Sequence, residues 1–416
     1  MPETHLGYGG YPPRPRGRFP IVRDRFHADR LADVPRAVFE GVQESFKVPF
    51  VGITTGAIRS GLFPVRDTGL STRGMADAAL SYLAGLTSEQ REAGVLPVDA
   101  SEWRRWTNAF PIWVPHGLLL EDMPTSQREA AMAIVRESMS ARGARETRDC
   151  MRANAVLAQV IGDYEDALTE WMYRFTIFGE PSPAEPWGWQ LIGHHLDVHC
   201  FVLGGQLVLT PSFMGAEARV ADRGPYAGMR LFDDEEMLGL AVMASLDGTQ
   251  RDRAVLFPTM NASELPTYLN HPTEGRMRTG AGADNLVLPY EGVVAADMSD
   301  SQRHLLLELI AVYVGRLTPG QQHVRMNEIE SHLDETYFAW VGAANDRDPF
   351  YYKIHSPVIV VEFDHHAGVF LSNNEPQRFH VHTIVRTPNG NDYGRDLLRQ
   401  HYQRNHRRAD FSVGMP

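Results

Sequence analysis

Closely spaced strand-like segments between residues 351 and 386 constrain the fold of this chain more than any other part of its sequence. Residues 358–361 form a β-branched run that is typical of a buried strand, and a short apolar run follows at 368–371. After a turn rich in Asn and Pro, residues 379–386 read as a further strand. This region is therefore predicted to supply strands to a sheet.

Two histidines and an arginine alternate along the last of these strands. Because successive side chains of a strand point to opposite faces, His380, His382 and Arg386 are expected on one face. An imidazole pair at this spacing can hold a metal ion or a substrate. The acidic pair Glu362 and Asp364 at the end of the neighbouring strand could complete the site. A solvated strand face is the alternative, because 17 histidines in one chain make some clustering by chance expected.

A second histidine-rich segment lies in the middle of the chain, at residues 187–217. Its Gly204-Gly205 pair between two apolar runs is a hairpin signal. The first strand of this hairpin would carry His195, Asp197 and His199 on one face. Buried polar groups need partners, so three of them in a row indicate a ligand or an ion. An outer, solvated face is again the alternative.

Helical patterns dominate the rest of the chain. The segments that open at Thr87, Thr125 and Ser299 are predicted to cap helix starts, and residues 233–245 are predicted to form a helix. Residues 71–178 and 230–347 are predicted to be helical, and strands are expected at 187–211 and 351–386. The predicted fold class is therefore α+β. It is mostly helical, around an antiparallel β-sheet assembled from middle and C-terminal strands.

The predicted sheet cannot be divided between two sequential domains, because its strands come from distant parts of the chain. Residues 31–416 are expected to form a single domain, preceded by an irregular arm at residues 1–30 that is rich in Gly, Pro and Arg. The long segment 261–296 has the composition of an active-site lid or of a surface excursion.

The overall composition narrows the classes of partner. A net charge of -12 argues against nucleic-acid binding, which requires a basic face. Two cysteines form no disulfide framework and fit a reducing, cytoplasmic environment. The sequence shows neither a signal peptide nor the ~20-residue apolar run of a membrane helix. The expected partner is a small-molecule substrate.

The turn after the histidine strand is expected to position the site. Asp392 is predicted to cap a helix over residues 393–402. The N-terminal amides of such a helix would point back toward the strand and favour an anionic substrate oxygen. A plain strand–turn–helix connection is the alternative.

Several motifs of the chain resemble a bacterial family, domain of unknown function 3500 (DUF3500), from about residue 67 to 402. The resemblance rests on WGW at 187–189, GHHL at 193–196, TPSFMGAE at 210–217, YKIHSP at 352–357, HVHT at 380–383 and NDYGRDLL at 391–398. The chain departs from the family pattern at three positions. His199 stands where Asn is usual, Ala218 where Pro is common, and Thr387 where an acidic residue is common.

The resemblance implies a function in actinomycete natural-product chemistry. It is associated with p-terphenyl products of the terfestatin type, in which a reduced quinone loses water to become aromatic. The first hypothesis is therefore a dehydratase, a lyase acting on a reduced quinone or polyhydroxylated ring, with a reductase as a partner in the pathway.

The predicted catalytic residues follow from what loss of water requires, a base for the C–H proton and an acid for the leaving hydroxyl. Histidine suits both roles, because its ordinary pKa lies near the working pH. His195 and His382 would form the acid–base pair, with Glu362 orienting one imidazole. Arg386 and His194 would bind an oxyanion. Substrate binding is assigned to Trp189, His199, Asp392 and Tyr393.

Two further hypotheses remain open. In one, His195, His380, His382 and Glu362 bind a transition metal (Zn, Fe or Mn), and the protein is a metal-dependent hydrolase or oxygenase. In the other, the histidine-rich sheet sequesters a metal or a metabolite without catalysis. Turnover of a substrate would separate the enzyme from the binding protein.

Overall fold

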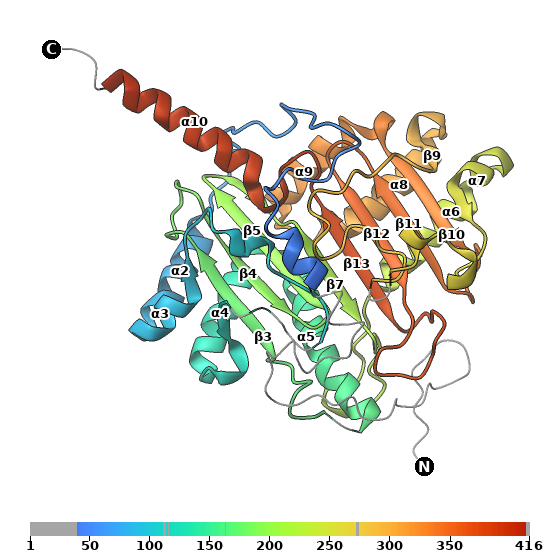
Figure 1. Cartoon of the computed structure of the whole chain (residues 1–416), viewed down its shortest axis with the longest axis horizontal. Helices are drawn as coiled ribbons and strands as arrows, with labels where there is room; N and C mark the ends of the chain where they lie inside the picture. The colour runs from blue at the N-terminus through green and yellow to red at the C-terminus, as the bar shows by residue number, and fades with distance from the viewer. Residues whose placement is uncertain (1–39, 111–113, 115, 163, 272–273, 413–416) are drawn as a thin grey trace.

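A large mixed sheet forms the centre of the protein. The computed structural model describes residues 40–110, 114, 116–162, 164–271 and 274–412. Within them a 13-stranded sheet runs in the order β1-β3-β4-β5-β7-β13-β12-β11-β10-β8, with β2, β6 and β9 paired to its sides. Figure 1 shows these strands side by side across the molecule. The α+β class is confirmed.

The strands are β1 (Val95–Leu96), β2 (Leu118–Leu119), β3 (Tyr173–Phe178), β4 (Trp187–Gly193), β5 (Leu196–Leu203), β6 (Gln206–Val208), β7 (Ser212–Ala216), β8 (Val255–Phe257), β9 (Val293–Val294), β10 (Tyr337–Gly342), β11 (Phe350–His355), β12 (Val360–His365) and β13 (Val381–Arg386). From residue 73 on, the α-helices of the described chain are α2 (Arg73–Ala84), α3 (Ser88–Gly94), α4 (Thr125–Ser138), α5 (Ala141–Ile161), α6 (Asp233–Ser245), α7 (Gly248–Ala254), α8 (Asp300–Val314), α9 (Pro319–Glu330) and α10 (Arg395–Ser412).

The pairing of β7 with β13 joins the middle and C-terminal strands into one sheet. His382 of β13 lies opposite Gly215 of β7 and, on its other side, opposite Asp364 of β12. From β3 to β10 every pairing along the path is antiparallel, whereas β1 with β3 and β8 with β10 are parallel. The sheet is therefore mixed, and the expectation of a purely antiparallel sheet holds only for its centre.

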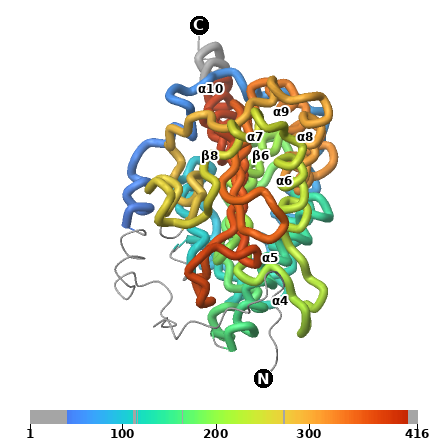
Figure 2. Tube along the Cα trace, turned by 90° about the vertical axis from the view of Figure 1, so that its right-hand side faces the viewer, coloured from blue at the N-terminus to red at the C-terminus, as the bar shows by residue number. Residues whose placement is uncertain are grey.

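The two faces of the sheet have different coverings. One face carries apolar residues such as Trp189, Met214 and Val381, which share a single core with residues of α2, α4, α5, α6 and α8. The opposite face carries most of the polar side chains predicted to form a site. Figure 2 shows helices α5, α6, α8 and α9 on one side of the sheet, with the chain near residues 40–60 and 260–290 on the other.

Helix starts follow the expected capping chemistry in two of three cases. Thr87 and Ser299 each form a capping box with the glutamine three residues later. The third predicted cap, at Thr125, is wrong, because Thr125 is already helical and Pro124 takes the cap position without a side-chain bond. Helix α6 has the bounds that the sequence predicts.

Several predicted element types are wrong. Residues 173–178 and 337–342, predicted to be helical, are strands β3 and β10, and each pairs with an antiparallel neighbour over six residues. Both segments are short and rich in aromatic residues, and such runs pack as readily into a buried strand as into a helix. The short run at 368–371 forms no strand beyond an isolated bridge at Leu371. The arm predicted at residues 1–30 lies outside the described residues.

None of the helices of the described residues combines the length and apolar character needed to cross a bilayer.

Candidate metal centre

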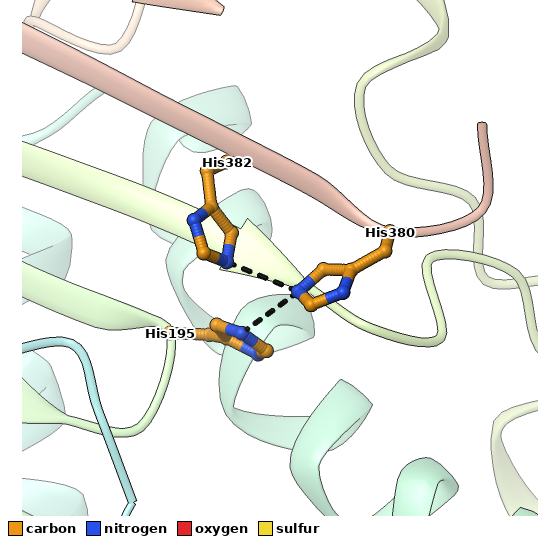
Figure 3. A group of neighbouring side chains, drawn as sticks. All are labelled: His195, His380 and His382. Carbon is orange, nitrogen blue, oxygen red and sulfur yellow. Dashed lines mark hydrogen bonds between the residues drawn. The ribbon is translucent and has the colours of Figure 1, made fainter. Parts of the chain in front are cut away.

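Three histidines from distant parts of the chain meet on the polar face of the sheet. His195 occupies the two-residue turn between β4 and β5, His380 lies just before β13, and His382 lies within β13. Figure 3 shows the three rings turned toward one another, with the ring nitrogen of His380 between the other two. The structure thus brings together three of the four predicted metal ligands.

The spacing of their ring nitrogens matches that of a metal site. Nε2 of His380 lies 3.3 Å from Nε2 of His195 and 3.0 Å from Nε2 of His382. One ligand atom from each residue lies within 4.8 Å of the others. Two imidazole nitrogens bound to one ion at about 2.0–2.1 Å in tetrahedral directions lie about 3.3 Å apart. Two of the three donor separations are therefore close to those of nitrogens bound to a single ion.

The protonation state of the three imidazoles also suits a metal. Burial lowers the pKa of His195, His380 and His382 well below the ordinary histidine value, and the neighbouring imidazoles lower it further. Neutral imidazoles keep a ring lone pair, which is the form that binds a metal.

The backbone fixes the position of His195. Its φ of 62° lies in the left-handed region, which a side-chain-bearing residue adopts at a cost and which marks constrained sites. Its amide donates to Asn108 O at 3.0 Å, and its carbonyl accepts from Gly215 N at 2.8 Å. Because both backbone groups are bonded to other segments, the ring is held at the end of the β4–β5 hairpin.

His194 supports the centre from outside. Its ring stacks on that of His195 with 3.9 Å between centroids, and its Nδ1 lies 2.8 Å from Asn154 Oδ1. Burial lowers the pKa of His194 to about 3. The oxyanion-binding role of His194 stays a prediction. In the structure the His194 ring packs against the ring of His195, and its Nδ1 is hydrogen-bonded to Asn154 of helix α5.

Glycine at position 215 leaves space for His382. A Cβ added to Gly215 would lie 2.8 Å from Val381 O and 3.1 Å from Cδ2 of His382. Any larger residue would therefore displace the strand or the imidazole.

Two further residues adjoin the three histidines: Asp364, which belongs to the predicted acidic end of the neighbouring strand, and His366, which the sequence pattern did not indicate. The ring of His366 lies 4.4 Å from that of His382 and 4.9 Å from that of His380, between centroids. Asp364, the cross-strand neighbour of His382, has Oδ2 3.9 Å from Nδ1 of His366. The sequence indicates Glu362 and Asp364 together, and the register between β12 and β13 decides that Asp364 is the one opposite His382.

The environment of Asp364 is unusual for a carboxyl group. Its Oδ2 accepts from the amide of Arg276 at 3.2 Å, whereas its Oδ1 has no hydrogen-bond partner among the described residues. Burial raises the pKa of Asp364 to about 7. A carboxyl group that titrates near neutral pH can both take and give a proton.

Glu362 is not part of the histidine group. Its carboxylate accepts from the amides of Arg278 at 2.9 Å and Thr279 at 2.8 Å, and from the hydroxyl of Tyr351 at 2.6 Å. Glu362 therefore anchors residues 278–279 of the predicted lid to the sheet. Within the described part of the chain, the candidate metal group consists of the three histidines.

Arg386 belongs to a separate buried cluster. Its guanidinium donates to Asp392 at 2.7 Å, to Asp284 at 2.6 Å and to Thr279 O at 2.8 Å. These partners raise the pKa of Arg386 despite the opposing effect of burial. With two carboxylates and a carbonyl as partners, Arg386 ties the lid segment to β13.

Tyr393 and His199 also lie in this second cluster. The hydroxyl of Tyr393 donates to Asp284 at 3.0 Å, and its ring contacts that of His199 at 5.1 Å between centroids. Nδ1 of His199 lies 2.8 Å from Pro211 O. The structure therefore places His199 and Tyr393 apart from the three histidines.

Asp392 does not cap an α-helix, and this prediction is wrong. It opens a short 3-10 turn, Asp392–Gly394, and its carboxylate accepts from Arg386 and from the amide of Thr387 at 2.7 Å. Helix α10 begins only at Arg395, because Tyr393 has a left-handed φ of 59°.

Trp189 lies on the opposite face of the sheet. Its ring stacks on that of Phe175, and its indole N–H donates to Ser138 at 2.9 Å. Trp189 is fully buried in the helix-covered core, away from the histidines.

Comparison with known proteins places the whole described site within one family. A family model described as Protein of unknown function (DUF3500) matches residues 68–395. The chain belongs to this family. No curated protein and no solved structure matches the chain. The DUF3500 match includes all three histidines of the metal group, Asp364, His366 and the Arg386 cluster.

Proposed function

We propose that this DUF3500 protein is a metal-dependent enzyme that acts on a small hydroxylated molecule, and that it removes water from its substrate. One observation carries the proposal: the convergence of three buried, neutral imidazoles on one point, with Nε2 separations of 3.0 and 3.3 Å. A structural role does not account for this convergence, because three ring nitrogens at one point cannot all be satisfied by hydrogen bonds to one another.

The proposed metal ligands are His195, His380 and His382. Of the predicted ions Zn, Fe and Mn, an all-imidazole donor set suits Zn and Fe, whereas Mn prefers oxygen ligands. A bound ion of this kind supplies a Lewis acid that polarises a substrate oxygen. The backbone bonds of His195 and the space left by Gly215 hold two of these ligands in place.

Asp364 and His366 are the proposed proton-transfer groups. Loss of water requires one group to take a C–H proton and another to protonate the departing hydroxyl, and such help contributes ~10²–10⁴-fold. Asp364 has a raised pKa of about 7 and a carboxyl oxygen without a described partner. His366 lies between Asp364 and the ring of His382, so the pair adjoins the metal group.

The proposed substrate is a reduced quinone or another polyhydroxylated ring, as in p-terphenyl-type biosynthesis. A partner reductase would supply it. This finer assignment rests on the association of such products with proteins of this kind and on the chemistry, since the loss of water from such a ring yields an aromatic product.

Metal content and turnover test the proposal together. Protein purified without chelator should carry close to one equivalent of a transition metal, and the variant His380→Ala should lose it. His199→Asn is the matched control, since it changes a buried histidine of the same sheet face that lies outside the metal group. It should keep the metal.

Mass spectrometry of candidate substrates should then show a product lighter by one water. A product of another mass would indicate hydrolysis or oxygenation and would contradict the dehydratase assignment. Metal binding without turnover of any ring substrate would favour a metal-binding protein. Wild-type protein with less than about a tenth of an equivalent of metal would reject the centre itself.

A further inference from the structure

One buried carboxylate anchors the loop between β12 and β13. Glu217 follows directly after β7 and is 1 % exposed. Its Oε1 accepts from the consecutive amides of Val369, Phe370 and Leu371 at 2.7, 2.9 and 2.8 Å, and its Oε2 accepts from the amide of Phe370 at 3.0 Å. Such a row of backbone N–H groups forms an anion-binding concavity, and here a side chain of the protein supplies the anion.

The start of this loop is tied to the metal group by backbone bonds. The amide of His366 donates to His380 O at 2.8 Å, and its carbonyl accepts from the amide of Gln377 at 3.1 Å. The loop is therefore fixed beside the ligand His380 at one point and at Glu217 at another. Because residues 369 and 370 belong to no strand, Glu217 supplies the acceptor that a strand neighbour would otherwise supply.

Phe370 connects this anchor with the metal group. Its ring lies 5.7 Å from that of His194 between centroids, in an edge-to-face arrangement. Phe110 contacts both rings, at 5.7 Å from Phe370 and 5.6 Å from His194. His194 in turn stacks on the ligand His195 at 3.9 Å. Two ring contacts therefore join the anchored backbone of Phe370 to a metal ligand.

The ring of His194 is held on several sides. Its Nδ1 lies 2.8 Å from Asn154 Oδ1, and one of its faces lies on His195. The rings of Phe110 and Phe370 contact it edge to face. Close-packed groups respond when a neighbour moves, because a void beside them loses the contacts on that side. A displacement of Phe370 is therefore expected to release His194, and with it the ring of His195.

We propose that Glu217 is a positioning residue of the candidate metal centre. By holding Phe370 against His194, it fixes the direction in which the ring of His195 presents Nε2. Glu217 is not itself one of the three ligands. This inference rests on the metal centre proposed above.

Two substitutions separate this role from a general contribution to stability. Glu217→Gln replaces one carboxylate oxygen by an NH2 group. In either orientation of the new amide this group faces the N–H of Phe370, because that N–H is bonded to both carboxylate oxygens. A donor then opposes a donor, and the loop loses its charged acceptor. Glu217→Asp keeps a carboxylate on a shorter side chain and is the rescuing variant.

The visible spectrum of the full-length protein loaded with cobalt(II) reports the geometry of the ligands. Glu217→Gln should change this spectrum and weaken cobalt(II) binding about tenfold. Glu217→Asp should recover part of both, and Phe370→Leu should reproduce the effects of Glu217→Gln. The double variant should bind cobalt(II) no more weakly than the weaker single variant, as expected for two residues that act in series. Asp284→Asn, at a buried carboxylate outside the metal group, controls for lost stability and should keep the wild-type spectrum.

Amide hydrogen exchange without added metal tests the anchor by itself. Exchange of the amides of residues 369–371 should be faster in Glu217→Gln than in the wild type. Faster exchange with unchanged cobalt(II) affinity and spectrum would overturn the positioning role, and additive losses in the double variant would overturn the route through Phe370. Wild-type protein that binds no cobalt(II) would reject the metal centre itself and this inference with it. That result differs from a cobalt-bound wild type with an unaffected variant, which rejects the role of Glu217 alone.

Discussion

The substitution Asp284→Asn should destabilise the fold strongly without removing the metal group. Asp284 is 1 % exposed and accepts from Arg386 at 2.6 Å, from Arg104 at 2.7 Å and from Tyr393 at 3.0 Å. Removing the charge of Asp284 leaves Arg104 without this buried carboxylate partner. It leaves Arg386 with Asp392 as its one carboxylate partner among the described residues. Breaking a buried ion pair on one side costs about 3–5 kcal/mol. The free energy of unfolding, measured by urea denaturation, should fall by about that amount.

Asp297→Asn provides the matched control for this prediction. Asp297 accepts from Arg253 at 2.6 Å, a bond of the same length as that between Asp284 and Arg386, but both side chains are about half exposed. An exposed pair contributes only about 0–1 kcal/mol, because water and salt screen it. The free energy of unfolding could instead fall by less than about 1 kcal/mol in Asp284→Asn, or by equal amounts in the two variants. Either result would refute the view that the buried Arg386 cluster holds the lid segment against the sheet. Loss of metal from the folded Asp284→Asn protein would instead place this cluster in the site.

Three other substitutions test separate parts of the account. Gly215→Ala should weaken metal binding about 10–100-fold in a chelator competition, because the added Cβ meets His382; unchanged affinity would contradict this. Asp364→Asn should lower kcat by about 10²–10⁴-fold with metal content unchanged, and normal turnover would exclude Asp364 from proton transfer. Burial alone would raise the pKa of Glu236, but hydrogen bonds from His365 and Arg378 lower it to about 2. Because the pKa of Glu236 is lower in the folded than in the unfolded chain, its carboxylate stabilises the fold above about pH 4.5, and this stabilisation is lost as the pH falls toward 2. Glu236→Gln should therefore lower the free energy of unfolding at neutral pH by about 3 kcal/mol and remove this part of its pH dependence. A wild-type-like pH dependence of urea unfolding in this variant would contradict the prediction.

The sequence predicts the parts of the site that depend on local alternation. His380 and His382 share a face because they are two residues apart on a strand, and this requires no knowledge of the neighbours. The Gly204-Gly205 hairpin between β5 and β6 is likewise a local signal, and the structure confirms it. His195 joins the group through the turn before β5 rather than through the strand itself.

The features that the local sequence does not specify depend on long-range pairing. Asp364 and His366 adjoin the histidines because of the register between β12 and β13, which the local pattern does not specify. Strand alternation predicts which face of the sheet Glu362 lies on. It does not predict that the loop containing residues 278–279 packs over that face, so the bonds from these amides to Glu362 do not follow from the local sequence. The sequence pattern predicts helix at strands β3 and β10, because the periodicity of a short apolar run does not distinguish a buried strand from the end of a helix.

X-ray absorption spectroscopy of the metal-loaded protein tests the central claim most directly. The first shell should contain three imidazole nitrogens at about 2.0–2.1 Å for zinc, and His380→Ala should lose this signature while His199→Asn keeps it. A first shell without imidazole scattering, or one that persists unchanged in His380→Ala, would contradict a metal centre formed by His195, His380 and His382.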